Sequence, residues 1–324
     1  MQAVSQYTIS PTAVSGLPGR IMRDEANGLE VTILDRGAEP VSLRLRDAAI
    51  GAWVAQLARE DQVSPDSPWR PLHFTHLGFH AHTIINQLAD YEGEPVRGSG
   101  HGLLPDFPHK RISEHVSDEL AAVTYTIEPG DYSRERYPRA LGFSIEQKLQ
   151  GGWLEVAYTV ENREPSRPVH LSFGAHPAYP IAQPENYRIQ LAPGRYRQWL
   201  IDGAVHLTGE TRDVLVPAGA AGDTFNFPWT IASLSSPVML EIMDVLVPAC
   251  VATDPVTGQS VEYDLVDRPY LTFWSNSPKF VCIEPIWGLP DAAVQTAFED
   301  KPGILTVPVG GRLTKRFRIR PFHA

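Results

Sequence analysis

The stretch FSIEQKLQGGWLEVAYTV, residues 143–160, decides the fold class of this 324-residue chain. Apolar side chains recur at every second position on both sides of Gly151 and Gly152, apart from the polar Gln147. Because successive side chains of a β-strand point to opposite faces of its sheet, this alternation predicts two half-buried strands. A glycine pair between such strands is typical of a tight turn. The stretch therefore predicts an antiparallel hairpin.

Strand-like segments continue along the rest of the chain. The further strands that we expect lie at residues 29–34, 41–46, 123–127, 169–173, 187–191, 214–216, 238–243, 261–265, 270–274, 280–283, 304–309 and 313–319. Residues 52–59 fit a short strand or one helical turn, and the few helical candidates are residues 84–89 and 292–298. Residues 1–27 look like a lead-in with at most an edge strand. With no repeat or linker, we expect one all-β domain over residues 1–324, an antiparallel sandwich with few short helices.

Composition and charge limit the classes of partner. The formal net charge of −10 and the isoelectric point near 5.6 argue against nucleic acid or an anionic membrane as a main partner. No apolar run reaches the roughly 18 residues of a transmembrane helix, and residues 1–20 lack the hydrophobic segment of a signal peptide. The only two cysteines are Cys250 and Cys282, and Cys282 is expected to be a buried free thiol. We therefore expect a cytoplasmic protein.

A carboxylate stands where an apolar strand meets a loop, in PKFVCIEPIWGLPD at residues 278–291. The predicted strand ends at Glu284, which Pro285 follows at once. A buried glutamate is costly unless it is paired, so Glu284 has no evident packing purpose and is a candidate functional residue. The alternative is a glutamate that accepts hydrogen bonds from loop amides.

Two histidines lie in segments that favour presentation to a ligand. In SFGAHPAYP, residues 172–180, a strand is expected to end at Gly174, and Pro177 biases His176 toward an extended conformation. His101 is flanked by glycines, which allow the backbone to approach a ligand closely. The alternatives are a histidine that caps a turn and a flexible surface loop, respectively.

Several segments together resemble one known family. GAHPAY at residues 174–179 and FVCIEPIWG at residues 280–288 are similar to the two signature segments of the aldose 1-epimerase (galactose mutarotase-like) family. The resemblance extends over about residues 28–320. Its other segments are the first hairpin at residues 28–45, Trp69-Arg70-Pro71, His101-Gly102, the Tyr-Pro…Phe element at residues 137–143 and KPGI at residues 301–304.

This resemblance implies a galactose mutarotase-like supersandwich with an open cleft for a monosaccharide. It also implies interconversion of the α and β anomers of an aldose by ring opening, without a metal or an organic cofactor. Carried over by position, Glu284 is the base that takes the O1 proton and His176 is the acid that protonates the ring oxygen. His101 hydrogen-bonds sugar hydroxyls and helps to polarise the ring oxygen. A carboxylate and an imidazole suit these roles because both can titrate near the working pH.

The chain departs from the family pattern around the expected sugar site. Phe79 occupies the place of a sugar-binding arginine, and no arginine follows the His101-Gly102 pair. The family's substrate-binding aspartate has no clear match, and Asp223 or Asn226 is nearest. Because a phosphate needs a cationic partner, these losses favour an unphosphorylated aldose.

Four histidines, His73, His76, His80 and His82, surround the missing arginine. His76, His80 and His82 are candidates to donate hydrogen bonds to sugar hydroxyls in its place. His80 and His82 would share a metal if they alternated on a strand, but no neighbouring cysteine or carboxylate completes that site, and we expect no metal. The alternative for this group is a solvated polar loop.

Aromatic side chains near the signature segments are candidates to stack on a sugar. We expect Trp287 and Tyr179 to line the cleft, whereas Trp274 is expected to pack inside the sandwich. The sequence thus predicts an aldose 1-epimerase, an isomerase of carbohydrate metabolism, acting on an unphosphorylated monosaccharide. The alternatives are a non-catalytic carbohydrate-binding protein that retains the cleft and another carbohydrate-active member of the superfold, such as a lyase.

Overall fold

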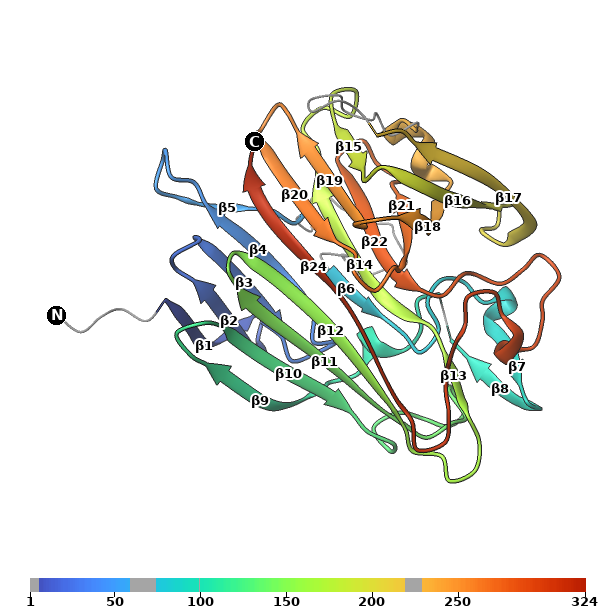
Figure 1. Cartoon of the computed structure of the whole chain (residues 1–324). Coiled ribbons are helices and arrows are strands. Elements are labelled where there is room, and N and C mark those ends of the chain that lie inside the picture. Colours follow the sequence, from blue (N-terminus) through green and yellow to red (C-terminus); the bar gives the residue numbers. More distant parts are fainter. Residues whose placement is uncertain (1–5, 59–73, 99, 219–228) are drawn as a thin grey trace.

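The structure is a computed structural model that describes residues 6–58, 74–98, 100–218 and 229–324 (Figure 1). Every pairing between its named strands is antiparallel, and most strands belong to three large sheets. The five-stranded sheet holds, in order, β1 (Tyr7–Val14), β2 (Leu17–Asp24), β3 (Leu29–Leu34), β4 (Pro40–Arg46) and β5 (Trp53–Ala55).

The two largest sheets form the body of the sandwich. The eight-stranded sheet has the order β15 (Arg188–Leu191), β19 (Ala249–Asp254), β20 (Gln259–Asp264), β24 (Arg312–His323), β12 (Trp153–Asn162), β11 (Leu141–Gln150), β10 (Ala121–Ile127) and β9 (Lys110–Val116). The seven-stranded sheet has the order β17 (Leu207–Val216), β16 (Gly194–Ile201), β18 (Val238–Val245), β21 (Tyr270–Trp274), β22 (Phe280–Trp287), β14 (Phe173–Pro180) and β6 (Phe74–Leu77).

Two small ladders and four short helical turns complete the described chain. The ladders pair β13 (Val169–Leu171) with β23 (Leu305–Val307) and β7 (Leu88–Tyr91) with β8 (Glu94–Arg97). The 3₁₀ turns are η1 (Ile85–Gln87), η2 (Leu104–Asp106), η3 (Ile231–Ser235) and η4 (Phe298–Asp300). In the described ranges, no helix is long and apolar enough to cross a membrane.

The predicted hairpin is present as β11 and β12. Phe143 pairs with Val160, and the ladder runs to a two-residue turn at Gly151 and Gly152. Both glycines have positive φ, 58° and 77°, which matches the hairpin turn that follows the twist of the strands. The all-β prediction is confirmed.

The eight-stranded sheet lies against the seven-stranded sheet (Figure 1), and contacts between aromatic rings join the two. Tyr158 of β12 lies 5.2 Å from Phe173 of β14 and 6.0 Å from Trp287 of β22, between ring centroids. Phe74 of β6 stacks on Phe317 of β24 at 6.2 Å. These large buried rings make the interface of the sandwich and fix the strands that carry the candidate site.

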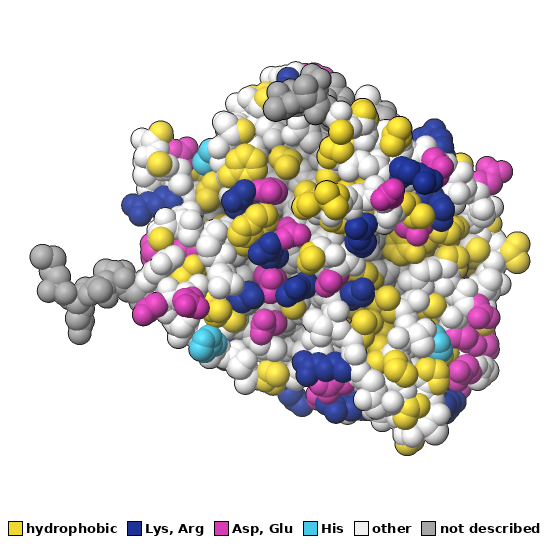
Figure 2. All heavy atoms as spheres, viewed as in Figure 1, with side chains coloured by type: hydrophobic (Ala, Val, Ile, Leu, Met, Phe, Trp, Pro, Cys, Tyr) yellow, Lys and Arg dark blue, Asp and Glu magenta, His cyan; other side chains and the backbone are white. Residues whose placement is uncertain are grey.

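The opposite face of the eight-stranded sheet carries charged side chains of both signs (Figure 2). Lys148 pairs with Glu155 at 2.7 Å across β11 and β12, and Arg320 pairs with Glu262 across β24 and β20. Opposite charges on neighbouring strands stabilise a sheet modestly and keep its solvent face polar.

Three local predictions differ from the structure. Residues 1–27 contain a hairpin, β1 and β2, that extends the first sheet, because Ile21 and Met22 continue the cross-strand pairing to β3. The expected edge strand is therefore joined by a second, inner strand. Residues 84–89 hold the 3₁₀ turn η1 and the start of β7, and residues 292–298 contain no helix apart from Phe298, the first residue of the 3₁₀ turn η4. Neither segment has the length that an isolated helix needs.

Candidate active site

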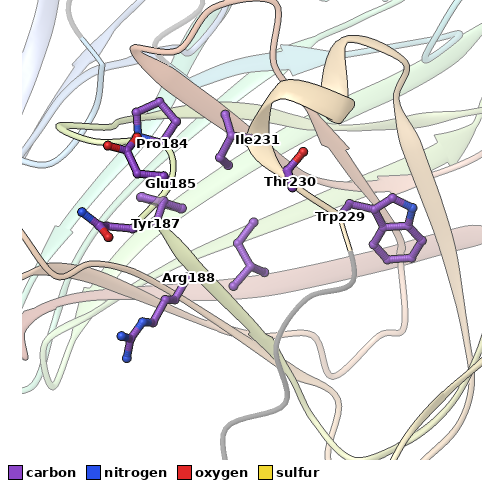
Figure 3. A pocket seen from close by; sticks show the side chains of 9 residues that line it. Pro184, Glu185, Tyr187, Arg188, Trp229, Thr230 and Ile231 are labelled. Atoms are coloured by element: carbon purple, nitrogen blue, oxygen red, sulfur yellow. The ribbon is translucent and has the colours of Figure 1, made fainter.

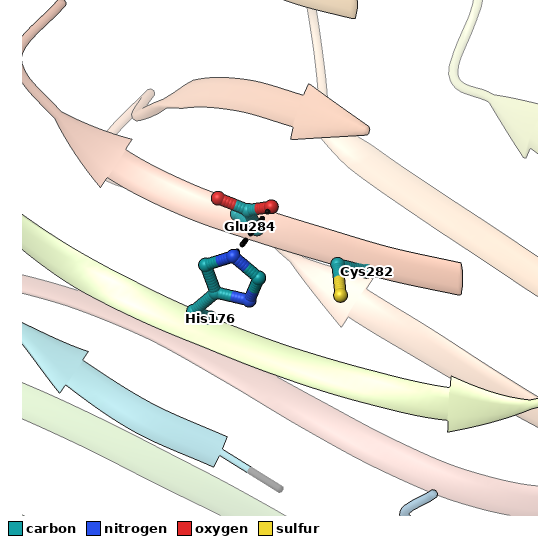
Figure 4. Close-up of side chains that lie close together, drawn as sticks. All are labelled: His176, Cys282 and Glu284. Carbon is teal, nitrogen blue, oxygen red and sulfur yellow. Dashed lines mark ion pairs between the residues drawn. The ribbon is translucent and has the colours of Figure 1, made fainter. Parts of the chain in front are cut away.

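Strand register places the two main candidates opposite each other. On β14 and β22, Gly174 pairs with Ile286 and Ala178 pairs with Cys282, so His176 falls opposite Glu284. Both strands run further than predicted, since β14 continues through His176 to Pro180 and β22 continues through Glu284 to Trp287. Segments far apart in the sequence thus meet at one point of the sheet (Figure 4).

Each of the two side chains precedes a proline, Pro177 or Pro285. A residue before proline is restricted to extended conformations, which suits the strands in which both residues lie. The structure therefore agrees with the extended presentation expected for His176. It differs from the expected strand end at Glu284, because Pro285 still pairs with Leu271 of β21.

The Glu284 carboxylate and the His176 imidazole are in contact. Oε1 of Glu284 lies 3.2 Å from Nε2 of His176, and the two residues are 2% and 3% exposed. Burial raises the pKa of the Glu284 carboxyl well above its usual value. Burial, followed by the neighbouring His101, lowers the pKa of His176 well below its usual value. The pair is therefore expected to hold one shared proton and no net charge.

A pocket of about 120 Å³ opens over this pair. Its lining combines residues of β14, β21 and β22 with loop residues that precede or follow other strands. The lining residues are His82, Thr83, His101, His176, Val205, Pro237, Thr272, Trp274 and Glu284.

Three buried polar atoms of this lining have no hydrogen-bond partner among the described residues. They are Nδ1 of His176, Nε2 of His82 and Oγ1 of Thr272. Thr272 pairs with Glu284 across β21 and β22, so its side chain lies in the same row as the acid–base pair. Leaving a buried donor or acceptor unsatisfied costs about 1–3 kcal/mol. A ligand rich in hydroxyl groups would satisfy these atoms.

His101 reaches the pocket from a tightly packed loop. Its φ is 71°, and its backbone N–H donates to the carbonyl of His82 at 3.0 Å. The next residue, Gly102, approaches the chain so closely that a Cβ there would lie 2.2 Å from the carbonyl oxygen of Gly78. The His101 ring lies edge-on to His176 at 5.1 Å. The loop is thus held against the pocket rather than freely exposed.

Burial favours the neutral form of the pocket histidines. Burial lowers the pKa of His101 to about 4. Burial, and then the charges of His101 and Lys301, lowers the pKa of His82 well below its usual value. Among the described lining residues there is no lysine or arginine. The described lining therefore suits a polar ligand without a negative charge.

Trp274 lines the pocket, which differs from the expectation that it only packs inside the sandwich. Its ring lies 5.8 Å from His176 and 5.8 Å from Phe280, so one part packs on the core while the rest borders the pocket. Side chains on β21 alternate, and Thr272 and Trp274 therefore share one face. That alternation was visible in the sequence, but the pairing with β22 was not.

Two predicted sugar contacts lie in the sandwich core instead. His76 is 1% exposed and contacts the Tyr158 hydroxyl through Nδ1 at 2.8 Å. Phe79 is fully buried, with its ring 5.1 Å from Tyr132 and 5.0 Å from Tyr137. Neither side chain is among the pocket lining. The aromatic surroundings of Phe79 explain why a phenylalanine stands there.

The two predicted aromatic contacts also lie away from this pocket. The Tyr179 hydroxyl is 2.6 Å from the Tyr263 hydroxyl, and the Trp287 indole donates to the carbonyl of Asp267 at 3.0 Å. Both side chains are buried and are absent from the described lining. Trp274 and not Trp287 borders the pocket over Glu284, because Trp287 lies on the face of β22 that packs on Tyr158.

The remaining candidates are placed as follows. Asp223, Asn226, His73 and residues 69–71 lie outside the described residues. His80 is fully buried, and residues 80–82 do not form a strand, so the alternation on which a shared metal depended does not apply.

A second, larger hollow of about 290 Å³ lies between residues 184–189 and residues 229–231 (Figure 3). Arg188 and Trp229 lie on different sides of this hollow, and the Arg188 side chain points away from Trp229. In the described chain, none of its lining residues carries a buried polar atom without a partner. The smaller pocket over Glu284 is therefore the better candidate for chemistry.

Comparisons with known proteins bear on the overall fold of the chain. No family model matches the sequence, and no curated protein matches it. Among solved structures, a galactose mutarotase related enzyme from Lactobacillus acidophilus has a TM-score of 0.75 at 17% identity, covering 97% of each chain. The chain has the galactose mutarotase-like fold.

Two further structures span the same architecture. A galactose mutarotase-like protein from Lactobacillus casei has a TM-score of 0.74 at 20% identity, over 97% of this chain and all of its own. A galactose 1-epimerase from Lactobacillus acidophilus has a TM-score of 0.69 at 12% identity, over 99% of this chain and all of its own. The galactose mutarotase-like fold thus accounts for nearly the whole length.

Proposed function

We propose that this protein is an aldose 1-epimerase, an isomerase that interconverts the α and β anomers of an unphosphorylated aldose. The observation that carries the proposal is the 3.2 Å contact between Glu284 and His176 in a pocket with unpartnered polar atoms. The likeness to galactose mutarotase-like structures supports it at the level of the fold. The buried free cysteines, Cys250 and Cys282, agree with a cytoplasmic location.

In the proposed reaction the single proton of the pair first moves to His176. The Glu284 carboxylate then removes the proton from the sugar O1, while the imidazolium donates its proton to the ring oxygen O5. The C1–O5 bond breaks as the C1–O1 bond becomes a carbonyl. Rotation about C1–C2 and reversal of these steps give the other anomer, with every proton returned.

The burial of Glu284 and His176 suits the proton transfers of this proposed reaction. A base and an acid in direct contact exchange a proton without releasing it to water, and general acid–base catalysis of this kind contributes about 10²–10⁴-fold in rate. In a low-dielectric pocket, the transient charges on Glu284 and His176 interact more strongly than in water. The same pair therefore serves the forward and the reverse opening of the ring.

The other polar atoms are assigned to binding. Thr272 and His82 present unpartnered atoms to sugar hydroxyls, and His101, beside His176, contacts hydroxyls near the ring oxygen. Trp274 offers an aromatic surface for the C–H face of the sugar. Because no lysine or arginine is among the described lining residues, the proposed substrate carries no phosphate.

A non-catalytic carbohydrate-binding protein is the second candidate, favoured by Phe79 where the resembling family has a sugar-binding arginine. Polarimetry of freshly dissolved α-anomers from a panel of aldoses separates the two. An isomerase accelerates the approach to equilibrium rotation for at least one sugar. Calorimetric binding of a sugar without any acceleration would favour the binding protein and contradict our proposal.

A further inference from the structure

Cys282 lies beside the proposed acid–base pair (Figure 4). It is two residues before Glu284 on β22, so both side chains are on the same face of the sheet. It pairs with Ala178 of β14, two residues from His176. The thiol is fully buried and free of a disulfide. The register of two strands therefore brings a thiol, an imidazole and a carboxylate together.

These three groups have the spacing of metal ligands. One donor atom from each of His176, Cys282 and Glu284 lies within 4.8 Å of the other two. The 3.2 Å between Nε2 of His176 and Oε1 of Glu284 is close to the roughly 3.3 Å edge of a tetrahedron with bonds of about 2 Å to zinc. Because the Cys282 sulfur lies within 4.8 Å of the other two donors, it would have to move by at most about 1.2 Å to complete the triangle at zinc–sulfur bonds of about 2.3 Å.

We propose that His176, Cys282 and Glu284 form a binding site for a thiophilic divalent cation, with Zn²⁺ as the best match. A thiolate, an imidazole and a carboxylate are all ligands that Zn²⁺ takes in proteins, and three protein ligands leave a fourth position for water. Because His176 and Glu284 line the pocket, we expect that fourth position to be open to it.

Charge balance favours this cation in a buried site. Binding displaces the Cys282 thiol proton and the proton shared by His176 and Glu284, and both protons pass to the buffer. The thiolate and the carboxylate together then neutralise the two charges of the ion. A buried ion whose charge is balanced by its ligands avoids the desolvation cost of a net charge.

The bound ion would occupy the lone pairs of the His176 imidazole and the Glu284 carboxylate, which the proposed proton transfers require. We therefore expect Zn²⁺ to inhibit anomer interconversion, and this consequence rests on the proposed function. The binding itself does not, because it depends only on the three ligands.

The test measures metal binding and activity separately in metal-free buffer. Isothermal titration with Zn²⁺ should give one site per chain, with a heat that depends on the ionisation enthalpy of the buffer because protons are released. Co²⁺ should show a thiolate charge-transfer absorption. Cys282→Ala should weaken Zn²⁺ binding by at least about 10–100-fold, the loss seen even for outer-shell partners, and should abolish the absorption.

Cys250→Ala is the matched control, since Cys250 is the other buried free thiol and belongs to no such cluster in the described chain. It should leave binding and absorption unchanged. Wild-type protein without a Zn²⁺ site, or equal binding by Cys282→Ala, would overturn the inference. Zn²⁺ that binds but accelerates interconversion would overturn the inhibitory role. A protein with no activity toward any aldose would refute only the proposed function.

Discussion

Two groups of histidines, all buried except the partly exposed His101, occupy neighbouring regions of this molecule. His82, His101 and His176 line the pocket over Glu284, whereas His76, His80 and His109 do not. Burial lowers the pKa in both groups, to about 3 for His76 and His80 and to about 4 for His101 and His109. Burial and a displaced pKa therefore do not identify the functional histidines.

The two groups differ in what surrounds them. His76 contacts the Tyr158 hydroxyl, and His109 contacts the carbonyl of Leu104 at 3.1 Å. His176 instead contacts a buried carboxylate at a pocket wall. An unpartnered ring nitrogen does not separate the groups, because His76, His80 and His109 each have one as well in the described chain. Contact with a titratable partner at a pocket is thus the informative observation.

Substitution of His176 should give the largest contrast between the groups. His176→Gln removes the proposed acid and should lower kcat/KM by about 100-fold or more, the usual range for a positioned acid or base. The matched change in the core, His76→Gln, should leave kcat/KM of the folded protein within a few-fold. Polarimetric rates, corrected for the folded fraction by circular dichroism, compare the two. Equal losses of kcat/KM in both variants would contradict the assignment of a catalytic role to His176 and a structural role to His76.

Truncation of Phe79 should affect stability and not catalysis. Phe79→Ala leaves a cavity among Tyr132, Tyr137 and Phe143 and should lower the free energy of unfolding by about 3–5 kcal/mol. Urea unfolding measures this loss, and Phe79→Leu should cost less. A Phe79→Ala protein that keeps its stability but loses sugar binding would instead place Phe79 at the substrate.

Acid should destabilise the fold through its buried histidines. In the unfolded chain a histidine has a pKa near 6.5, whereas the pKa of His80 in the fold is about 3. The stabilising contribution is complete above pH 6.5 and falls by about 1.4 kcal/mol per pH unit below it, as the unfolded state takes up the proton.

Replacement of one core histidine should reduce this sensitivity. Between pH 6.5 and 5, His80→Gln should lose about 2 kcal/mol less stability than the wild type. Urea unfolding at several pH values gives both curves. Parallel curves would show that His80 takes up its proton as readily in the folded protein as in the unfolded chain, so that its pKa is not lowered.

The smallest expected effect concerns the hydroxyl of Thr272. Thr272→Val preserves the shape of the side chain and removes the unpartnered Oγ1. The loss of one net hydrogen bond to the substrate, about 0.5–1.5 kcal/mol, should lower kcat/KM by about 2- to 13-fold. Thr272→Ser keeps the hydroxyl and should retain most of the activity. A valine variant as active as the wild type would exclude a substrate contact at this position.

The all-β class followed from short-range patterns in the sequence, whereas the galactose mutarotase-like supersandwich was predicted from the family resemblance. The alternation in residues 143–160 and the glycine pair determine a hairpin without reference to the rest of the chain. The inner strand β2 was missed because its arginines, Arg20 and Arg23, interrupt the apolar pattern. In the structure these arginines pair with Glu114 and Glu30 across strands.

The site was only partly predictable because it depends on register between distant strands. Resemblance brought His101, His176 and Glu284 forward, and all three line one pocket. Thr272 and Trp274 belong to that pocket only because β21 pairs with β22, which periodicity alone does not specify. The same limit applied to Cys282, whose neighbours come from two strands.

The most direct test of the account is the rate of mutarotation with Glu284→Gln, followed by polarimetry on the best aldose substrate. Glutamine keeps the size of the side chain and its place beside His176 but cannot accept the O1 proton. We predict a fall in kcat/KM of about 100-fold or more, with the variant folded and still able to bind the sugar. A Glu284→Gln protein that catalyses mutarotation at the wild-type rate would contradict the account.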